Sequence, residues 1–159
     1  MTTIALIIAA CLAIVLGSSL WATGPKLKDA LVKATRALPA STTAVTSSAI
    51  DTGVSSAGEQ RAAVEFELSA PLVTTAQLPD TKVFVYDVIH SDNADLSSPS
   101  TLIDNAITQT GASSSGAAAD SKRFKLPSNA KRYIGFTVSP SASGTGDASG
   151  ATATLEGVF

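Results

Sequence analysis

The stretch KVFVYDVI, residues 82–89, decides the fold class of this chain of 159 residues. Its side chains are almost continuously apolar, and most of them are β-branched or aromatic. Turn-forming residues precede it at Pro79-Asp80 and follow it at Ser91-Asp92-Asn93. A short apolar run between such turn signals is typical of a central strand in a β-sandwich.

Further strands are predicted on both sides of this run. Residues 63–68 alternate apolar and acidic side chains, as a half-buried strand does, and residues 132–138 form a third strong candidate. Weaker candidates lie at 43–51, 100–107, 122–126 and 151–159. Seven or eight short strands separated by turns predict a mainly β fold, a jelly-roll-like β-sandwich over residues 41–159 with an N-terminal helical extension.

Two connections in this domain consist of small residues. They read QTGASSSGAAA at 109–119 and SPSASGTGDASG at 139–150. Neither contains a large apolar side chain that would hold it to a core, so we expect long exposed connections between strands. The second is rich in glycine, but it lacks the lysine and the following helix of a phosphate-binding loop.

The composition argues against catalysis. Ser, Thr, Ala and Gly together make up 77 of the 159 residues, and only 15% of the residues are charged. A single Cys excludes an intrachain disulfide, and one His with one Cys excludes most transition-metal sites. A formal net charge of −2 gives no overall attraction to nucleic acid. We therefore expect no enzymatic activity, no cofactor, no metal and no direct nucleic-acid binding.

Residues 1–24 form a separate apolar segment, which contains the uncharged run TIALIIAACLAIVL at 3–16. A helix over residues 4–22 would be about 28 Å long, close to the thickness of a bilayer's hydrocarbon core. Trp21 and the lysines beyond it suit a membrane anchor. A signal peptide is the second interpretation, although no basic residue precedes the run. The third is a helix or arm buried against other protein.

Residues 25–40 predict a short amphipathic helix or linker. Prolines near both ends suit the first turn and the end of a helix. Leu27, Leu31 and Leu38 fall on one face at helical spacing. Such a helix either caps the following domain or docks its leucines into a groove of a partner.

Three polar groups invite a functional interpretation. His90 lies near Ser91 and Asp92, which are the residue types of a catalytic triad, but Ser and Asp are so frequent here that the spacing carries little weight. Glu65 and Glu67 share one strand face, which is also what any solvated strand face shows. The basic residues at 122–132 suit a partner-facing strip or a plain solvated hairpin better than a nucleic-acid site, because few aromatic residues accompany them.

Several short motifs occur in a characteristic order. SAIDTG at 48–53 comes first, and SDNADLSSP at 91–99 follows the 82–89 strand. LPSNAKRY at 126–133 then leads through Gly144 and Gly150 to the closing strand. As an ordered set, these motifs resemble the Bbp16-like capsid cement (decoration) proteins of tailed bacteriophages.

This resemblance covers about the last two-thirds of the chain, and it carries turn and strand features rather than an active site. It implies a virion protein on the outer face of a phage head, a homo-oligomer (dimer or trimer) that clamps neighbouring subunits of the major capsid protein. It also favours protein over membrane as the partner of the apolar segment. The side chains expected to contact that partner are Ile4, Leu6, Ile7, Leu12, Ile14, Val15, Leu16, Leu27, Leu31 and Leu38. The alternative is a membrane-anchored or secreted β-sandwich adhesin.

Overall fold

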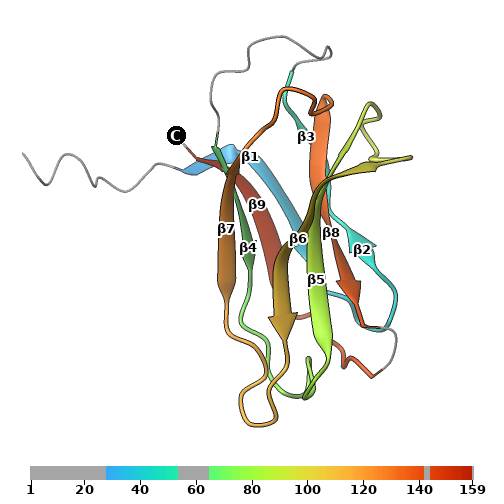
Figure 1. Cartoon of the computed structure of the whole chain (residues 1–159), viewed down its shortest axis with the longest axis vertical. Helices are drawn as coiled ribbons and strands as arrows, with labels where there is room; N and C mark the ends of the chain where they lie inside the picture. Colours follow the sequence, from blue (N-terminus) through green and yellow to red (C-terminus); the bar gives the residue numbers. More distant parts are fainter. Residues whose placement is uncertain (1–27, 54–64, 142–143, 159) are drawn as a thin grey trace, which may run out of the picture.

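The computed structural model describes residues 28–53, 65–141 and 144–158. These residues form two antiparallel β-sheets that pack face to face, so the predicted β-sandwich is confirmed (Figure 1). The apolar segment 1–24 lies outside the described residues. In the part of the chain that the structure describes, no helix is long and apolar enough to cross a membrane.

Sheet A has four strands in the order β1-β9-β4-β7. Their bounds are Lys28–Ala37 for β1, Glu65–Ala70 for β4, Asp120–Lys125 for β7 and Thr152–Val158 for β9. Sheet B has five strands, four of them in the order β2-β8-β5-β6, and β3 also pairs with β8. Their bounds are Val45–Thr46 for β2, Ile50–Asp51 for β3, Val83–Ser91 for β5, Ser100–Thr110 for β6 and Tyr133–Pro140 for β8.

The antiparallel pairs are nested about the middle of the described chain. β5 pairs with β6, β4 with β7, β2 and β3 with β8, and β1 with β9. Going outward from β5 and β6, these pairs lie alternately in sheet B and sheet A. The chain therefore follows the path of one long hairpin whose two arms are wound across both sheets.

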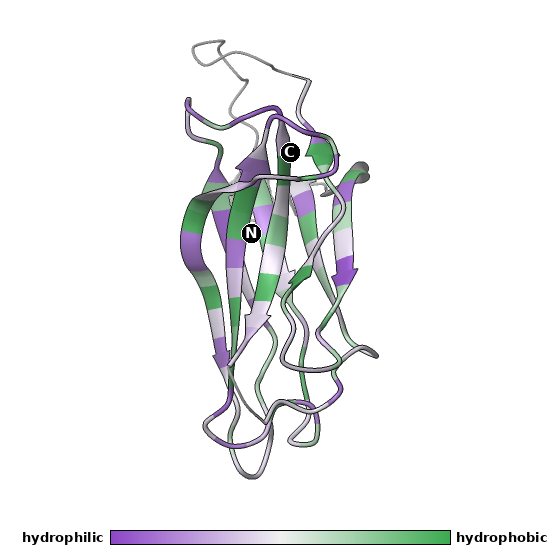
Figure 2. Cartoon of the chain, turned by 90° about the vertical axis from the view of Figure 1, so that its right-hand side faces the viewer, coloured by the Kyte–Doolittle hydropathy of each residue, from purple (hydrophilic) through white to green (hydrophobic). Residues whose placement is uncertain are grey.

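The core lies between the sheets, because alternate residues of each strand point inward. Figure 2 shows the resulting bands of hydrophobic and hydrophilic residues along the strands. The largest fully buried side chains include Tyr86, Phe66, Phe84, Phe136, Leu38 and Leu68. Few aromatic residues are available, and most of those described are placed in this single apolar layer.

The amphipathic helix predicted at 25–40 is wrong. Lys28–Ala37 is a ten-residue strand that pairs with β9. Its apolar residues fit a strand as well as a helix, because Val32 and Ala34 lie two positions apart and both pack toward the core. The ladder with β9 outweighs the local helix propensity. The boundary predicted at residue 41 is therefore wrong too, since β1 already belongs to the sandwich.

The other strand predictions are confirmed in position. The strong candidates correspond to β4, β5 and β8, and the weaker ones at 100–107, 122–126 and 151–159 correspond to β6, β7 and β9. The candidate at 43–51 is divided into the two short strands β2 and β3. Both pair with β8, so this divided segment still occupies one position in sheet B.

One end of the sandwich, which we call the glycine end, consists of residues 71–82, 111–119 and 144–151. Its loops pack backbone against backbone: a Cβ at Gly116 would lie 2.1 Å from the carbonyl oxygen of Val73, and one at Gly146 would lie 1.8 Å from that of Ala76. The glycines there are required for this close approach. The prediction of exposed connections is wrong for Gly116, which is buried, but it holds for residues 112–115, 118, 119, 149 and 150, which are exposed.

A buried hydrogen-bond network joins the glycine end to sheet B. Tyr86 Oη donates to Gln109 Oε1 at 2.7 Å, and Gln109 Nε2 donates to the carbonyls of Pro71 and Ala118 at 2.8 and 2.7 Å. Burial raises the pKa of Tyr86 well above its usual range, so the hydroxyl remains a donor. The side chain of Gln109 thereby holds two loops against one strand.

Candidate partner interface

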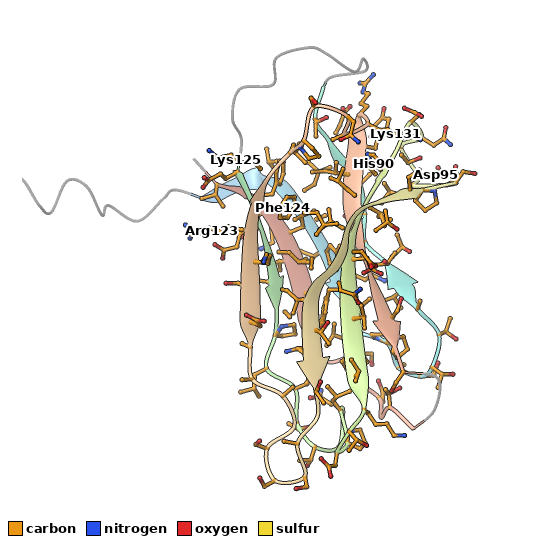
Figure 3. All side chains as sticks on the ribbon, in the orientation of Figure 1. His90, Asp95, Arg123, Phe124, Lys125 and Lys131 are labelled. Carbon is orange, nitrogen blue, oxygen red and sulfur yellow. The ribbon has the colours of Figure 1, made fainter. Side chains whose placement is uncertain are left out.

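The opposite end of the sandwich, which we call the motif end, consists of residues 50–53, 91–99 and 126–133. These are the segments that carry most of the family resemblance. β3 and the last residue of β5 flank the start of β8, so that Asp51 and Ser91 both lie opposite Tyr133. Figure 3 shows His90, Asp95 and Lys131 at this end. The fold thus brings motifs from distant parts of the sequence into one surface.

An ion pair connects the first and third of these segments. Arg132 Nε and Nη2 donate to the two carboxylate oxygens of Asp51 at 2.9 and 2.8 Å. The N–H of Thr52 donates to the Arg132 carbonyl at 3.0 Å, and its Oγ1 donates to the same carbonyl at 2.7 Å. Hydrogen bonding to Arg132, with a further bond from the Gly53 N–H, lowers the pKa of Asp51 to about 2. This carboxylate is therefore charged at neutral pH.

Arg132 also contacts the aromatic ring beside it. Its guanidinium carbon lies 5.2 Å from the centroid of the Tyr133 ring. The side chains of Arg132 and Asp51 remain 42% and 45% exposed, so this pre-formed arrangement faces solvent. Arg and Tyr are among the residues that contribute most to binding at protein interfaces. The bidentate bond to Asp51 on β3 holds Arg132 in one conformation beside Tyr133, the first residue of β8.

The loop at 92–98 folds over the outer face of sheet B. Leu96 is 4% exposed although it lies outside the sandwich core, and its backbone has a positive φ of 56°. Gly135 on β8 makes room for it: a Cβ there would lie 2.5 Å from Leu96 Cδ1 and 2.8 Å from Ser47 Oγ. Ser91 Oγ fixes the loop by donating to the Ser97 carbonyl at 2.7 Å. The SDN motif is therefore a structural turn.

His90 is buried at the end of β5 and has a positioning contact. Its Nδ1 accepts a hydrogen bond from the backbone N–H of Lys131 at 3.0 Å. Lys131 Nζ in turn lies 3.1 Å from a carboxylate oxygen of Asp92. The imidazole of His90 thus holds the 126–133 loop in place. This structural contact explains the buried histidine without the need for a catalytic role.

Glu67, one of the predicted glutamate pair on β4, belongs to a row of charges across the outer face of sheet A. Glu67 forms an ion pair with Arg123 on β7 at 2.5 Å, and Glu156 on β9 forms one with Lys33 on β1 at 2.7 Å. Glu67 and Glu156 lie opposite each other in the ladder, and the two basic residues flank them. These cross-strand ion pairs give Glu67 and Glu156 a structural role in sheet A.

The structure describes only some of the residues predicted to contact a partner. The apolar segment and Leu27 lie outside the described residues. Leu31 lies on β1, and its side chain is outside the description as well. Leu38 is wrong as a docking residue, because it is 2% exposed and belongs to the core cluster of the sandwich itself.

Sequence reasoning missed the bond between Asp51 and Arg132, although both residues were within recognised motifs. The two residues are separated by 81 positions, and only the pairing of β3 with β8 places them together. Within the described ranges, the structure contains no group of three or more His, Cys, Asp or Glu residues arranged to hold a metal ion. Asp51, Arg132 and Tyr133 form a fixed, polar and partly exposed cluster at this end.

Comparison with known proteins adds no assignment. No protein-family model matches the chain, and no curated protein sequence matches it either.

Proposed function

We propose that the two sheets form a jelly roll. With β2 and β3 counted as one position, the strand orders become 1-8-3-6 in sheet A and 2-7-4-5 in sheet B. The nested pairs 4-5, 3-6, 2-7 and 1-8 alternate between the sheets, as expected when one long hairpin is rolled into two Greek keys. This order goes beyond a general sandwich and supports the jelly-roll-like fold that the strand pattern predicts.

We propose that the protein is a virion structural protein that clamps neighbouring major capsid protein subunits on the surface of a phage head. The observation that carries this proposal is the convergence of the resembling motifs at one end of the sandwich. Arg132, Tyr133 and Asp51 together provide an exposed, pre-oriented contact surface there. Such a surface suits recognition of another protein better than chemistry on a small substrate.

A clamp of this kind works through repetition. A capsid offers the same site many times, and a dimer or trimer that engages two or more sites gains avidity from the effective concentration of its second site. Stabilisation of the shell then requires a rigid scaffold and contact area rather than a reactive group. The nested pairing of β1 with β9 and of β2 and β3 with β8 supplies this rigidity, because the first and last described strands are paired with each other in sheet A.

Binding to reconstituted capsids tests the proposal. The full chain is mixed with shells of the major capsid protein encoded beside it, and bound protein is quantified after sedimentation. A variant without residues 1–24 measures the contribution of the apolar segment, and it leaves β1 intact, whereas removal of residues 1–39 would delete a core strand. We expect saturable binding by the full chain and weaker binding by the truncated chain. Absence of saturable binding by the full chain would contradict the capsid assignment.

The membrane-anchored adhesin is the second candidate, and the apolar segment is the observation that favours it. Fractionation of cells that express the full chain separates the two functions. Recovery in the envelope fraction alone, with release only by detergent, would favour the anchor. Recovery of full-length protein on sedimented capsids would favour the clamp.

A further inference from the structure

Each sheet of the sandwich ends in two edge strands, and three of the four edges are protected against the addition of another strand. β2 has only two residues. The pairing of β1 with β9 shifts between Asp29 and Lys33, and the pairing of β6 with β5 shifts twice. On β6, Asn105 also has a positive φ of 50°. Short edges and bulges prevent a second chain from continuing a sheet.

β7 is the exception among these edges. It pairs with β4 over all six residues without a register shift. On its other side, no described strand is bonded to it. A regular edge strand presents a row of backbone N–H and C=O groups that a further strand can use. β7 is therefore the edge best suited to accept another chain.

The side chains of β7 define what kind of strand would fit. Arg123 and Lys125 lie on the outer side of the sheet, whereas Phe124 lies on the side of the opposite sheet (Figure 3). Arg123 is already paired with Glu67. Lys122 and Lys125 form no ion pair with any residue in the described ranges, so their charges are open to a partner.

The pairing of β4 with β7 shows which side chains match this strand. On the occupied side, β4 places Glu65 opposite Lys125 and Glu67 opposite Arg123. Between them, the rings of Phe66 and Phe124 stack with their centroids 6.1 Å apart. A strand with the same alternation of acidic and apolar side chains would match the free side of β7 by the same rules.

We propose that the free edge of β7 binds an extended segment of a partner protein in which acidic and apolar residues alternate. The segment becomes the fifth strand of sheet A. Its backbone pairs with β7, its acidic side chains lie beside Lys125 and Arg123, and its apolar side chains lie beside Phe124. The basic side chains on this edge repel basic strands, so they favour an acidic one. This binding mode does not depend on the capsid assignment.

A labelled peptide with the sequence AVEFELSA, residues 63–70, which includes β4, is the probe. Fluorescence anisotropy measures its binding to the full chain at low salt. Two control peptides separate the contributions: one carries Glu65→Lys and Glu67→Lys, and the other keeps all side chains but is N-methylated at alternate backbone nitrogens. We expect saturable binding of the first peptide and a loss of at least about tenfold in affinity for each control, since one lacks the charges and the other lacks the ladder bonds.

Variants of the protein locate the binding site. Lys125→Glu should weaken peptide binding by about tenfold, whereas Lys82→Glu, which changes charge at the glycine end, should leave it unchanged. Thermal unfolding of each variant shows that it is folded, and the reversed-charge peptide tests the same interaction without altering the protein. Equal binding of the N-methylated peptide would overturn strand addition. So would self-association of the unmodified chain that the Lys125→Glu change abolishes, because a second copy would then occupy β7.

Discussion

The two ends of the sandwich are built from different contacts. At the glycine end, loops approach one another through their backbones, and the buried side chain of Gln109 ties them to sheet B. At the motif end, side chains hold the loops: Leu96 packs onto sheet B, His90 binds the 126–133 loop, and Arg132 pairs with Asp51.

The two ends therefore differ in which substitutions we expect to change stability and which we expect to change binding. Backbone packing closes the sandwich at the glycine end, although Leu72 and the loop tip at 112–115 remain exposed there. Arg132 and Asp51 at the motif end hold each other in place, and their side chains remain nearly half exposed to solvent. We therefore expect substitutions at the glycine end to reduce stability, and substitutions of the exposed residues at the motif end to change binding while stability is largely kept.

The largest effect is expected from Gly116→Ala at the glycine end. A Cβ there would lie 2.1 Å from the Val73 carbonyl oxygen, and the residue has a φ of +69°. Overpacking and left-handed backbone together should lower the free energy of unfolding by about 3 kcal/mol in urea titrations. Gly53→Ala is the matched control, because Gly53 has a φ of +72° and no atom near the added carbon, so a loss of about 1 kcal/mol is expected. Equal losses in both variants would show that close packing is unimportant.

Replacement of Gln109 tests the buried network at the same end. Gln109→Leu leaves the carbonyls of Pro71 and Ala118 and the hydroxyl of Tyr86 without this partner. We expect a loss of about 2 to 3 kcal/mol in the free energy of unfolding, and a smaller loss of about 1 kcal/mol for Tyr86→Phe. Calorimetric unfolding measures both. A larger loss for Tyr86→Phe than for Gln109→Leu would contradict the role given to the amide.

At the motif end, Leu96 and Gly135 should behave as a coupled pair. Leu96→Ala removes a buried side chain and should cost about 2 kcal/mol. Gly135→Ala alone should also destabilise, because its Cβ would lie 2.5 Å from Leu96 Cδ1. In the double variant this collision is absent, so the combined loss should be smaller than the sum of the single losses. Strict additivity in urea unfolding would show that the loop does not rest on Gly135.

The smallest effect on stability is expected from Asp51→Asn. Because the pKa of Asp51 is lowered from 3.8 to about 2 in the folded protein, the contribution of its ion pair is present above about pH 4 and is lost as the pH falls toward 2. The stability difference between the native chain and Asp51→Asn should be constant from pH 5 to 7 and shrink below pH 4. Denaturant titrations across this pH range measure it. A difference that grows on acidification would reverse the predicted sign.

Much of the fold was predictable because strand signals are local. The alternation in β4 and the apolar run of β5 identify strands without knowledge of their partners. The sequence predicts a helix in place of β1 because Leu27, Leu31 and Leu38 fall at helical spacing, whereas Val32 and Ala34 pack toward the core at strand spacing, and the ladder with β9 joins residues more than a hundred positions apart. The pairing of strands, not their sequence alone, decided its structure.

The candidate site was less predictable for the same reason. The sequence identified the segments that contain Asp51 and Arg132, but the bond between them depends on the pairing of β3 with β8. Leu96 gave no signal either, since a single leucine in a turn segment acquires its role only when Gly135 lies beneath it. The packing of the glycine end could not be predicted from composition either. Small residues there suggest exposed loops, but they also allow close contact between backbones.

We propose a clamp on the surface of a phage head, and the occupancy of the protein on purified virions tests this proposal most directly. Intact virions of the phage that encodes the chain are purified by density gradient, and the ratio of this protein to the major capsid protein is measured by quantitative mass spectrometry. The account predicts a fixed ratio that persists through repeated washing, as expected for a symmetric, multivalent contact. Absence of the protein from virions, or a ratio that falls with each wash, would contradict it.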